Sequence, residues 1–240
     1  MSDVDTVNGA ITASSAGALT VTDVASGTNG NIVLSTSSGD ITGLATVNAG
    51  SGNVTLNSAG AIVDDGSSGT VITGGVLTAD AAGAITIDST VTSANISTSA
   101  TGAVDLDETD AITLTDVDTN DGSITVDAGG LITATDVVAS GGSGDSVTLS
   151  TTTGGAVATL VTGADAVSIT ANAGDITIGS VTATAGTLGV TATAGSINDA
   201  ADDNTADFTA GGLISLTAQD EIGVLGSGSD LDLEFATGSS

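Results

Sequence analysis

The sequence predicts an all-β fold, a single parallel β-helix (β-solenoid) with about 21 residues and three short strands per coil. Three observations predict it: a short aliphatic phrase recurs along the chain, it recurs regularly, and large side chains are almost absent. The 240 residues include 35 Gly and two Phe but no Trp, Tyr, Pro or Cys. An interior built from Val, Ile, Leu and Ala favours many small stacked layers over one bulky core.

The recurring phrase begins with Gly or Asp and a small residue, and continues with two aliphatic residues around a central one that is most often Thr or Ser. It occurs at 30–34, 52–56, 83–87, 102–106, 110–114, 122–126, 145–149, 165–169, 174–178 and 212–216. A period of two, β-branched residues and flanking turn formers are typical of short strands. No segment keeps the i, i+3, i+4, i+7 spacing of an amphipathic helix, so we expect no helix.

The aliphatic positions fall into three series. The first is Val104, Ile124, Val147, Val167, Leu188 and Ile214; the second is Ile112, Ile132, Val157, Ile176, Ile197 and Ile222; the third is Val117, Val137, Val161 and Val181. Ile32, Val54 and Val76 repeat at the same step in the first half. A period near 21 residues is typical of a solenoid, in which each inward residue stacks on its equivalent one coil away. Between residues 76 and 104 the register stays open, because Ile85 and Ile96 fit more than one phase.

We expect one continuous solenoid domain over residues 1–240, with roughly eleven coils. The acidic stretch 198–207 interrupts the spacing and is predicted to protrude as a loop. Tandem immunoglobulin-like domains would repeat at about 100 residues and carry a core aromatic residue. An antiparallel meander would use the same strands but would give no reason for the longer period.

The charge is entirely negative: 29 Asp and Glu residues stand against no Lys, Arg or His. Without a cationic side chain no ion pair can form between side chains, so the carboxylates must face water, cap turns or bind metal. The charge repels nucleic acid and anionic lipid, and we expect neither as a partner. No apolar run of about 18 residues is present, so we expect no membrane insertion, and the first residues do not resemble a signal peptide.

The phrases SAGAI (58–62), TAGSI (193–197) and AGGLISL (210–216) resemble the repeats of filamentous-haemagglutinin-type exoproteins. The resemblance extends from about Gly9 to Leu233. It implies a right-handed parallel β-helix, an extracellular or cell-surface location, and a structural or adhesive role. Such proteins are large bacterial exoproteins, often exported by two-partner secretion.

The residue types argue against an enzyme. Without His, Lys, Cys or Tyr, a Ser or Thr nucleophile has no conventional base beside it. A carboxylate pair could hydrolyse a glycosidic bond, but such catalytic sites also need an aromatic platform or a basic residue to hold the sugar, and the chain has neither.

A candidate calcium site lies in the acidic stretch 105–127. Its proposed ligands are Asp116, Asp118, Asn120, Asp121 and Asp127. Their alternation resembles an EF-hand loop, although Gly122 falls at the seventh position and Asp, not Glu, closes the window. The alternative is that these side chains cap turns and face solvent. A second, weaker acidic group is Asp199, Asp202, Asp203 and Asp207.

Threonine pairs suggest an ice-binding face. They are Thr113/Thr115, Thr133/Thr135, Thr151/Thr153, Thr182/Thr184 and Thr191/Thr193. The alternative is that Thr is simply favoured at solvent-facing strand positions.

The sequence therefore favours a structural or adhesive rod segment of a secreted or cell-surface repeat protein, able to form filaments. A calcium-dependent surface-layer or matrix component is the alternative, and an ice-binding solenoid is the third. The expected partners are neighbouring coils, copies of the chain stacked end to end, and a host or surface receptor. Calcium is the one cofactor considered.

Overall fold

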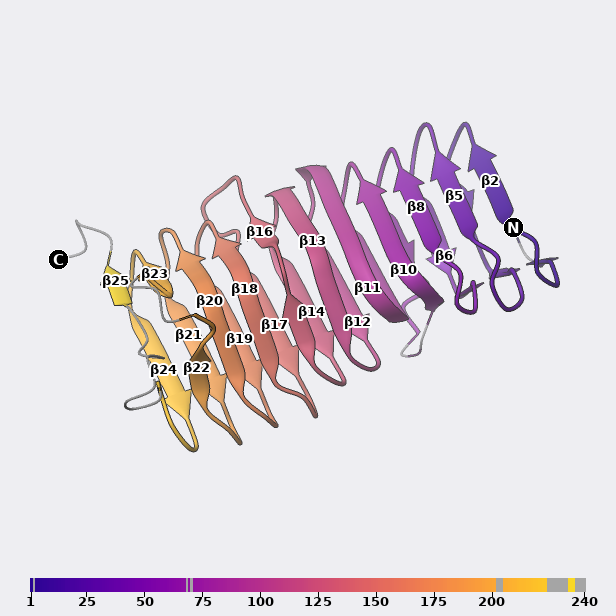
Figure 1. The fold of residues 1–240 in the computed structure, drawn as a ribbon. Helices are drawn as coiled ribbons and strands as arrows, with labels where there is room; N and C mark the ends of the chain where they lie inside the picture. The colour runs from indigo at the N-terminus through magenta and orange to yellow at the C-terminus, as the bar shows by residue number, and fades with distance from the viewer. Residues whose placement is uncertain (2, 68, 70, 202–204, 224–232, 236–240) are drawn as a thin grey trace.

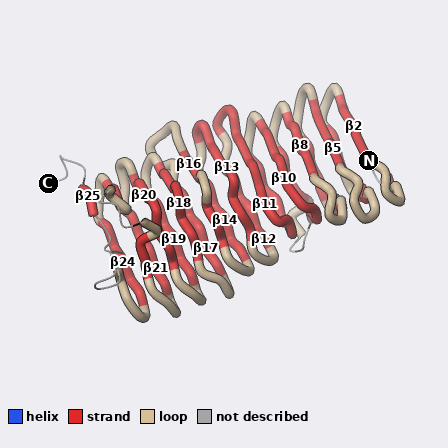
Figure 2. Tube along the Cα trace, in the orientation of Figure 1, coloured by secondary structure: helices blue, strands red, loops and turns tan. Residues whose placement is uncertain are grey.

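The computed structural model describes residues 1–240 except 2, 68, 70, 202–204, 224–232 and 236–240. The described residues form no helix; they form a parallel β-solenoid of about 9 turns with roughly 21 residues per turn (Figures 1 and 2). The step from Leu188 to its register partner Ile214 is longer than the other steps on its face, because it includes the acidic stretch 198–207.

The strands lie on three faces of the solenoid, which we call faces A, B and C. Face A contains β3 (Leu19–Thr20), β6 (Ile41–Leu44), β9 (Ile62–Asp64), the start of β11 (Ile85–Thr101), β12 (Val104–Glu108), β14 (Ile124–Ala128), β17 (Val147–Thr151), β19 (Val167–Ala171), β21 (Leu188–Ala192) and β24 (Ile214–Ala218).

Face B contains β2 (Ile11–Ser15), β5 (Ile32–Thr36), β8 (Val54–Ser58), the ends of β10 (Ile72–Ala81), β11, β13 (Ile112–Asp121), β18 (Ala156–Gly163) and β20 (Ile176–Ala183), and β16 (Val137–Ala139), β23 (Phe208–Ala210) and β25 (Leu233–Phe235). Face C contains β1 (Val4–Asp5), β4 (Asp23–Ala25), β7 (Thr46–Asn48), β15 (Ile132–Ala134), β22 (Ile197–Asp199), the starts of β10, β13, β18 and β20, and the middle of β11. Several strands therefore bend across a corner and serve two faces.

The register confirms the first and third predicted series. Val104, Ile124, Val147, Val167, Leu188 and Ile214 are successive partners on face A. Val117, Val137, Val161 and Val181 are successive partners on face B. The open register is also resolved: Ile85 pairs with Val104 in the first series, and Ile96 pairs with Val117 in the third.

Two predicted positions are wrong by one residue. Ala156, not Val157, pairs with Ile132 and Ile176. Leu77, not Val76, pairs with Val54, and Val76 is 37% exposed. In both cases adjacent apolar residues compete for one inward position, and a shift of one residue exchanges the two faces of a strand.

The core is one continuous aliphatic column, with one exception to the predicted composition. Ile124, Val126, Ile132 and Val147 are fully buried, as the alternation predicts. Phe208 is also fully buried and pairs with Val181, so the interior does accept an aromatic ring near its C-terminal end.

Hydroxyl groups and glycines close the corners. The buried hydroxyl of Thr36 donates to the carbonyl of Gly39 at 2.7 Å, and Thr98 donates to Gly102 at 3.0 Å. A Cβ on Gly122 would lie 2.3 Å from the carbonyl oxygen of Gly102 in the adjacent coil, so this corner requires glycine. Small residues thus allow neighbouring coils to stack at the strand spacing of about 4.8 Å.

The predicted acidic loop at 198–207 lies only partly within the described residues. Its first two residues end β22, and Asp207 is buried immediately before β23. Asp202 and Asp203 lie outside the described residues.

Candidate functional site

The five predicted calcium ligands lie on two strands. Asp116, Asp118, Asn120 and Asp121 belong to β13, and Asp127 belongs to β14 on face A. Asp116, Asp118 and Asn120 alternate along β13, so the extended strand holds them in a row, whereas an EF-hand loop wraps its ligands around the cation. Among the residues that the structure describes, no three acidic side chains converge as ligands of one metal.

Asp118 nevertheless lies in a crowded acidic environment. Partial burial raises its pKa to about 6, and repulsion from Asp116 and Asp136 adds to the effect. One carboxylate oxygen of Asp136, Oδ1, is buried without a hydrogen-bond partner. Asp118 is therefore repelled by two neighbouring carboxylates, and the chain has no cationic side chain to balance them.

A column of carboxylates also follows the outer side of face A. Asp88, Asp107 and Asp127 are register partners in successive coils. Burial raises the pKa of Asp107, as do its neighbours, of which Asp105 contributes most. Unit charges about 4.8 Å apart repel by about 1 kcal/mol even in water.

Beyond Asp127 the same column consists of hydroxyl groups. Its members are Ser150, Thr170, Thr191 and Thr217. The predicted threonine pairs do not form one array of this kind: Thr113 and Thr133 are partners on face C, whereas Thr151 is buried and donates to the carbonyl of Gly154. Hydroxyl groups gather on face A instead.

Sequence reasoning missed the buried Glu108. It lies between Ser89 and Ala128 at an inward position and is 4% exposed. Its Oε2 accepts hydrogen bonds from Ser89 Oγ at 2.6 Å and from the Val91 amide at 3.1 Å. Burial raises the pKa of Glu108. The period-two alternation of Val104, Leu106 and Glu108 was the signal that could have revealed it.

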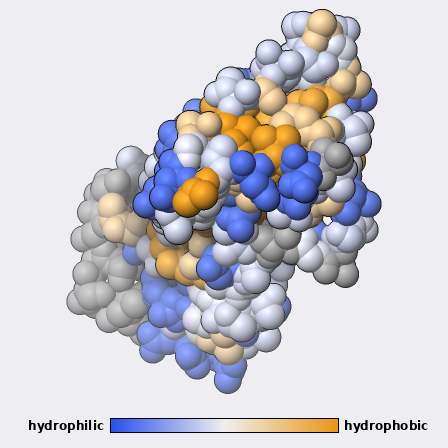
Figure 3. All heavy atoms as spheres, turned by 90° about the vertical axis from the view of Figure 1, so that its right-hand side faces the viewer, coloured by the Kyte–Doolittle hydropathy of each residue, from blue (hydrophilic) through white to orange (hydrophobic). Residues whose placement is uncertain are grey.

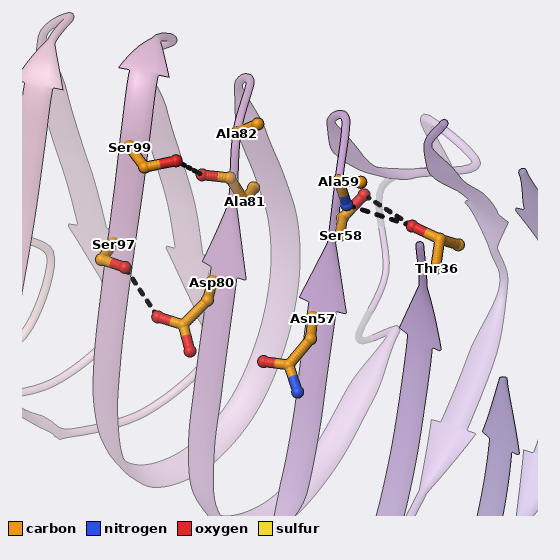
Figure 4. Close-up of a pocket in the computed structure, with 9 residues that line it drawn as sticks. All are labelled: Thr36, Asn57, Ser58, Ala59, Asp80, Ala81, Ala82, Ser97 and Ser99. Carbon is orange, nitrogen blue, oxygen red and sulfur yellow. Dashed lines mark hydrogen bonds between the residues drawn. The ribbon is translucent and has the colours of Figure 1, made fainter. Parts of the chain in front are cut away.

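A shallow polar groove of about 470 Å³ crosses four successive coils on face B (Figure 4). It is lined by Thr36, Asn57, Ser58, Ala59, Asp80, Ala81, Ala82, Ser97 and Ser99. Asp80 is the register partner of both Asn57 and Ser97, so these three side chains form a row along the rod axis. This groove could not be predicted from the sequence, because its lining residues are separated by whole coils.

Comparison with family models, curated proteins and solved structures finds no match to this chain. In the described part of the chain there is no helix with the length and hydrophobicity needed to cross a membrane.

Proposed function

We propose that this chain is a structural rod segment of a secreted or cell-surface repeat protein, with an adhesive role and the ability to extend end to end. The observation that carries the proposal is the uninterrupted parallel ladder, which runs on face A from Leu19 to Ile214. A parallel ladder ends in unpaired backbone donors and acceptors, so each end is a template for a further coil.

Core side chains are incompletely covered at both ends of this ladder. Met1, Val4, Ala13 and Leu19 are only partly buried at one end, as are Ile214, Leu216 and Ala218 at the other. Figure 3 looks at the N-terminal end and shows hydrophobic side chains gathered at its centre. A further coil, from a longer chain or from a second copy, would bury these residues and continue the aliphatic column.

The charge favours stacking along the axis over association side by side. A net charge of −29 repels the flanks of neighbouring rods. The absence of Lys and Arg also leaves no cleavage site for trypsin-like proteases, which suits an extracellular rod. The resemblance to filamentous-haemagglutinin-type repeats supports the same location and role.

Electron microscopy of the purified chain tests the stacking. We expect thin filaments at high protein concentration, and more of them at high salt, because salt screens the residual repulsion between ends. Leu19→Glu should shorten the filaments, since it places a charge in the junction. Leu160→Glu is the matched control, because Leu160 is 37% exposed on β18 in the middle of the rod. Compact particles of uniform length under every condition would contradict stacking.

A second candidate is a calcium-dependent surface-layer or matrix component. It is favoured by the crowded carboxylates of Asp116, Asp118 and Asp136, which a divalent cation would neutralise. The hydroxyl column of face A favours a third candidate, ice binding, and a solution without thermal hysteresis would exclude it.

A further inference from the structure

We propose that the groove on face B binds a neutral saccharide, held by Asn57 and Asp80. Such binding needs only the four coils of β5, β8, β10 and β11, and it is independent of where the rod is located. Figure 4 shows Asn57, Asp80 and Ser97 on neighbouring strands, with Ala59, Ala81 and Ala82 near the strand ends.

Some polar side chains that line the groove already have hydrogen-bond partners within the protein, whereas others are free to bind a ligand. Ser58 Oγ donates to the carbonyl of Ala61 at 2.9 Å, and Thr36 Oγ1 donates to that of Gly39 at 2.7 Å, so these hydroxyls maintain the corners. Ser97 Oγ donates to Asp80 Oδ1 at 2.6 Å, which fixes the carboxylate. Within the described residues, neither the side-chain amide of Asn57 nor Oδ2 of Asp80 has a hydrogen-bond partner, so both are available to a ligand.

These available groups match the chemistry of a sugar. An amide supplies two donors and one acceptor, and a carboxylate oxygen accepts from hydroxyl groups, so together they can engage adjacent hydroxyls of a pyranose ring. The two side chains are one strand apart, about 4.8 Å along the axis. Ala59 and Ala82 have small side chains that reach the surface, so they leave room for the ring and offer an apolar contact to its C–H groups.

Other ligand classes fit less well. Phosphate and nucleic acid are repelled by Asp80 and by the net charge of −29. A metal ion would find a single carboxylate among the lining residues, which is too few for a calcium site. An apolar ligand would leave the polar row without partners. Because the groove has no aromatic platform, we expect millimolar affinity.

NMR titration of the ¹⁵N-labelled chain tests the proposal, with maltotriose, cellotriose, mannotriose and chitotriose as probes. At least one trisaccharide should shift the side-chain amide signal of Asn57 and the backbone signals near Asp80 and Ser97 in a saturable manner. Asn57→Ala and Asp80→Asn should each weaken binding about tenfold, which corresponds to the loss of one or two hydrogen bonds.

The matched control is Asp127→Asn, which removes one carboxylate on face A and should leave the affinity unchanged. The circular dichroism spectrum of each variant establishes that it is folded. The proposal is overturned if no probe shifts these signals, or if the shifts persist at full affinity in Asn57→Ala. It is equally overturned if calcium chloride alone perturbs the same residues and the sugars do not, because the groove would then be a cation site.

Discussion

The substitution Asp118→Asn should stabilise the rod at neutral pH. Asp118 lies in β13 beside Asp116 and Asp136, and its pKa is raised from the ordinary 3.8 to about 6, first by burial and then by these neighbours. The folded chain therefore binds a proton at this side chain more tightly than the unfolded chain does. This contribution to stability is fully present below pH 3.8 and is lost as the pH rises through about 6. Asn mimics the protonated carboxyl group at every pH.

The size of the expected stabilisation follows from the pKa shift of Asp118 and from its exposure to solvent. A pKa raised from 3.8 to about 6 corresponds to about 3 kcal/mol at most. Asp118 is mainly exposed to solvent, so screening reduces the expected gain to about 1 kcal/mol. For a chain of this size, that raises the melting temperature by about 2–4 °C at pH 7.5. At pH 3.5 the variant and the wild type should have the same stability.

Hydrogen exchange gives a local measurement, because coils of a solenoid can open separately. The Val117 amide donates to the carbonyl of Asp136 at 2.9 Å and reports on the coils around Asp118. Its exchange should slow about fivefold in Asp118→Asn at pH 7.5, the equivalent of about 1 kcal/mol. Asp3→Asn is the control, since it removes the same charge from an exposed site near the N-terminus. Equal effects of the two substitutions would refute the local argument and leave only the net charge.

Three further predictions concern the core, the buried acid and calcium. Ile124→Asp should unfold the neighbouring coils, because a buried unpaired carboxylate costs several kcal/mol, and retention of the wild-type circular dichroism and melting temperature would contradict the core position. Glu108→Ala should destabilise the rod by about 2 kcal/mol in urea unfolding, since it removes the acceptor of the Val91 amide. Glu108→Gln keeps an acceptor and should cost less; a similar loss in both variants would argue against this role. Millimolar calcium should raise the melting temperature, and Asp118→Ala should remove most of that gain; an equal gain in both proteins would indicate general charge screening.

The fold was predictable because the same constraint is repeated in every coil. Each inward position of the first series must fit above its equivalent, so the alternation and the period together determine the register of Val104, Ile124 and Val147. Predictions were wrong where two apolar residues stand side by side, as at Val76 and Leu77. The pattern there permits two registers, and only the contacts of the neighbouring coil select one.

The site-level features were less predictable, because they depend on residues in different coils. Asn57 and Asp80 are register partners on neighbouring strands but stand a whole turn apart in the sequence, so no local motif marks their pairing. The calcium prediction took the spacing of Asp116 to Asp127 as a loop motif. The same alternation is also typical of a strand, so the sequence alone does not distinguish a ligand loop from the strands β13 and β14.

The lack of cationic side chains connects the rod, its acidic columns and its proposed assembly. In-register stacking places identical charges one strand apart, so each Asp on face A repels its equivalents above and below. A compact fold would bring all 29 acidic residues into a small volume, whereas a rod separates them along its axis. The aliphatic column itself carries no charge, so the proposed association along the axis would bring fewer carboxylates together than association side by side. Protons or divalent cations should reduce the repulsion between the acidic columns and thereby strengthen the fold.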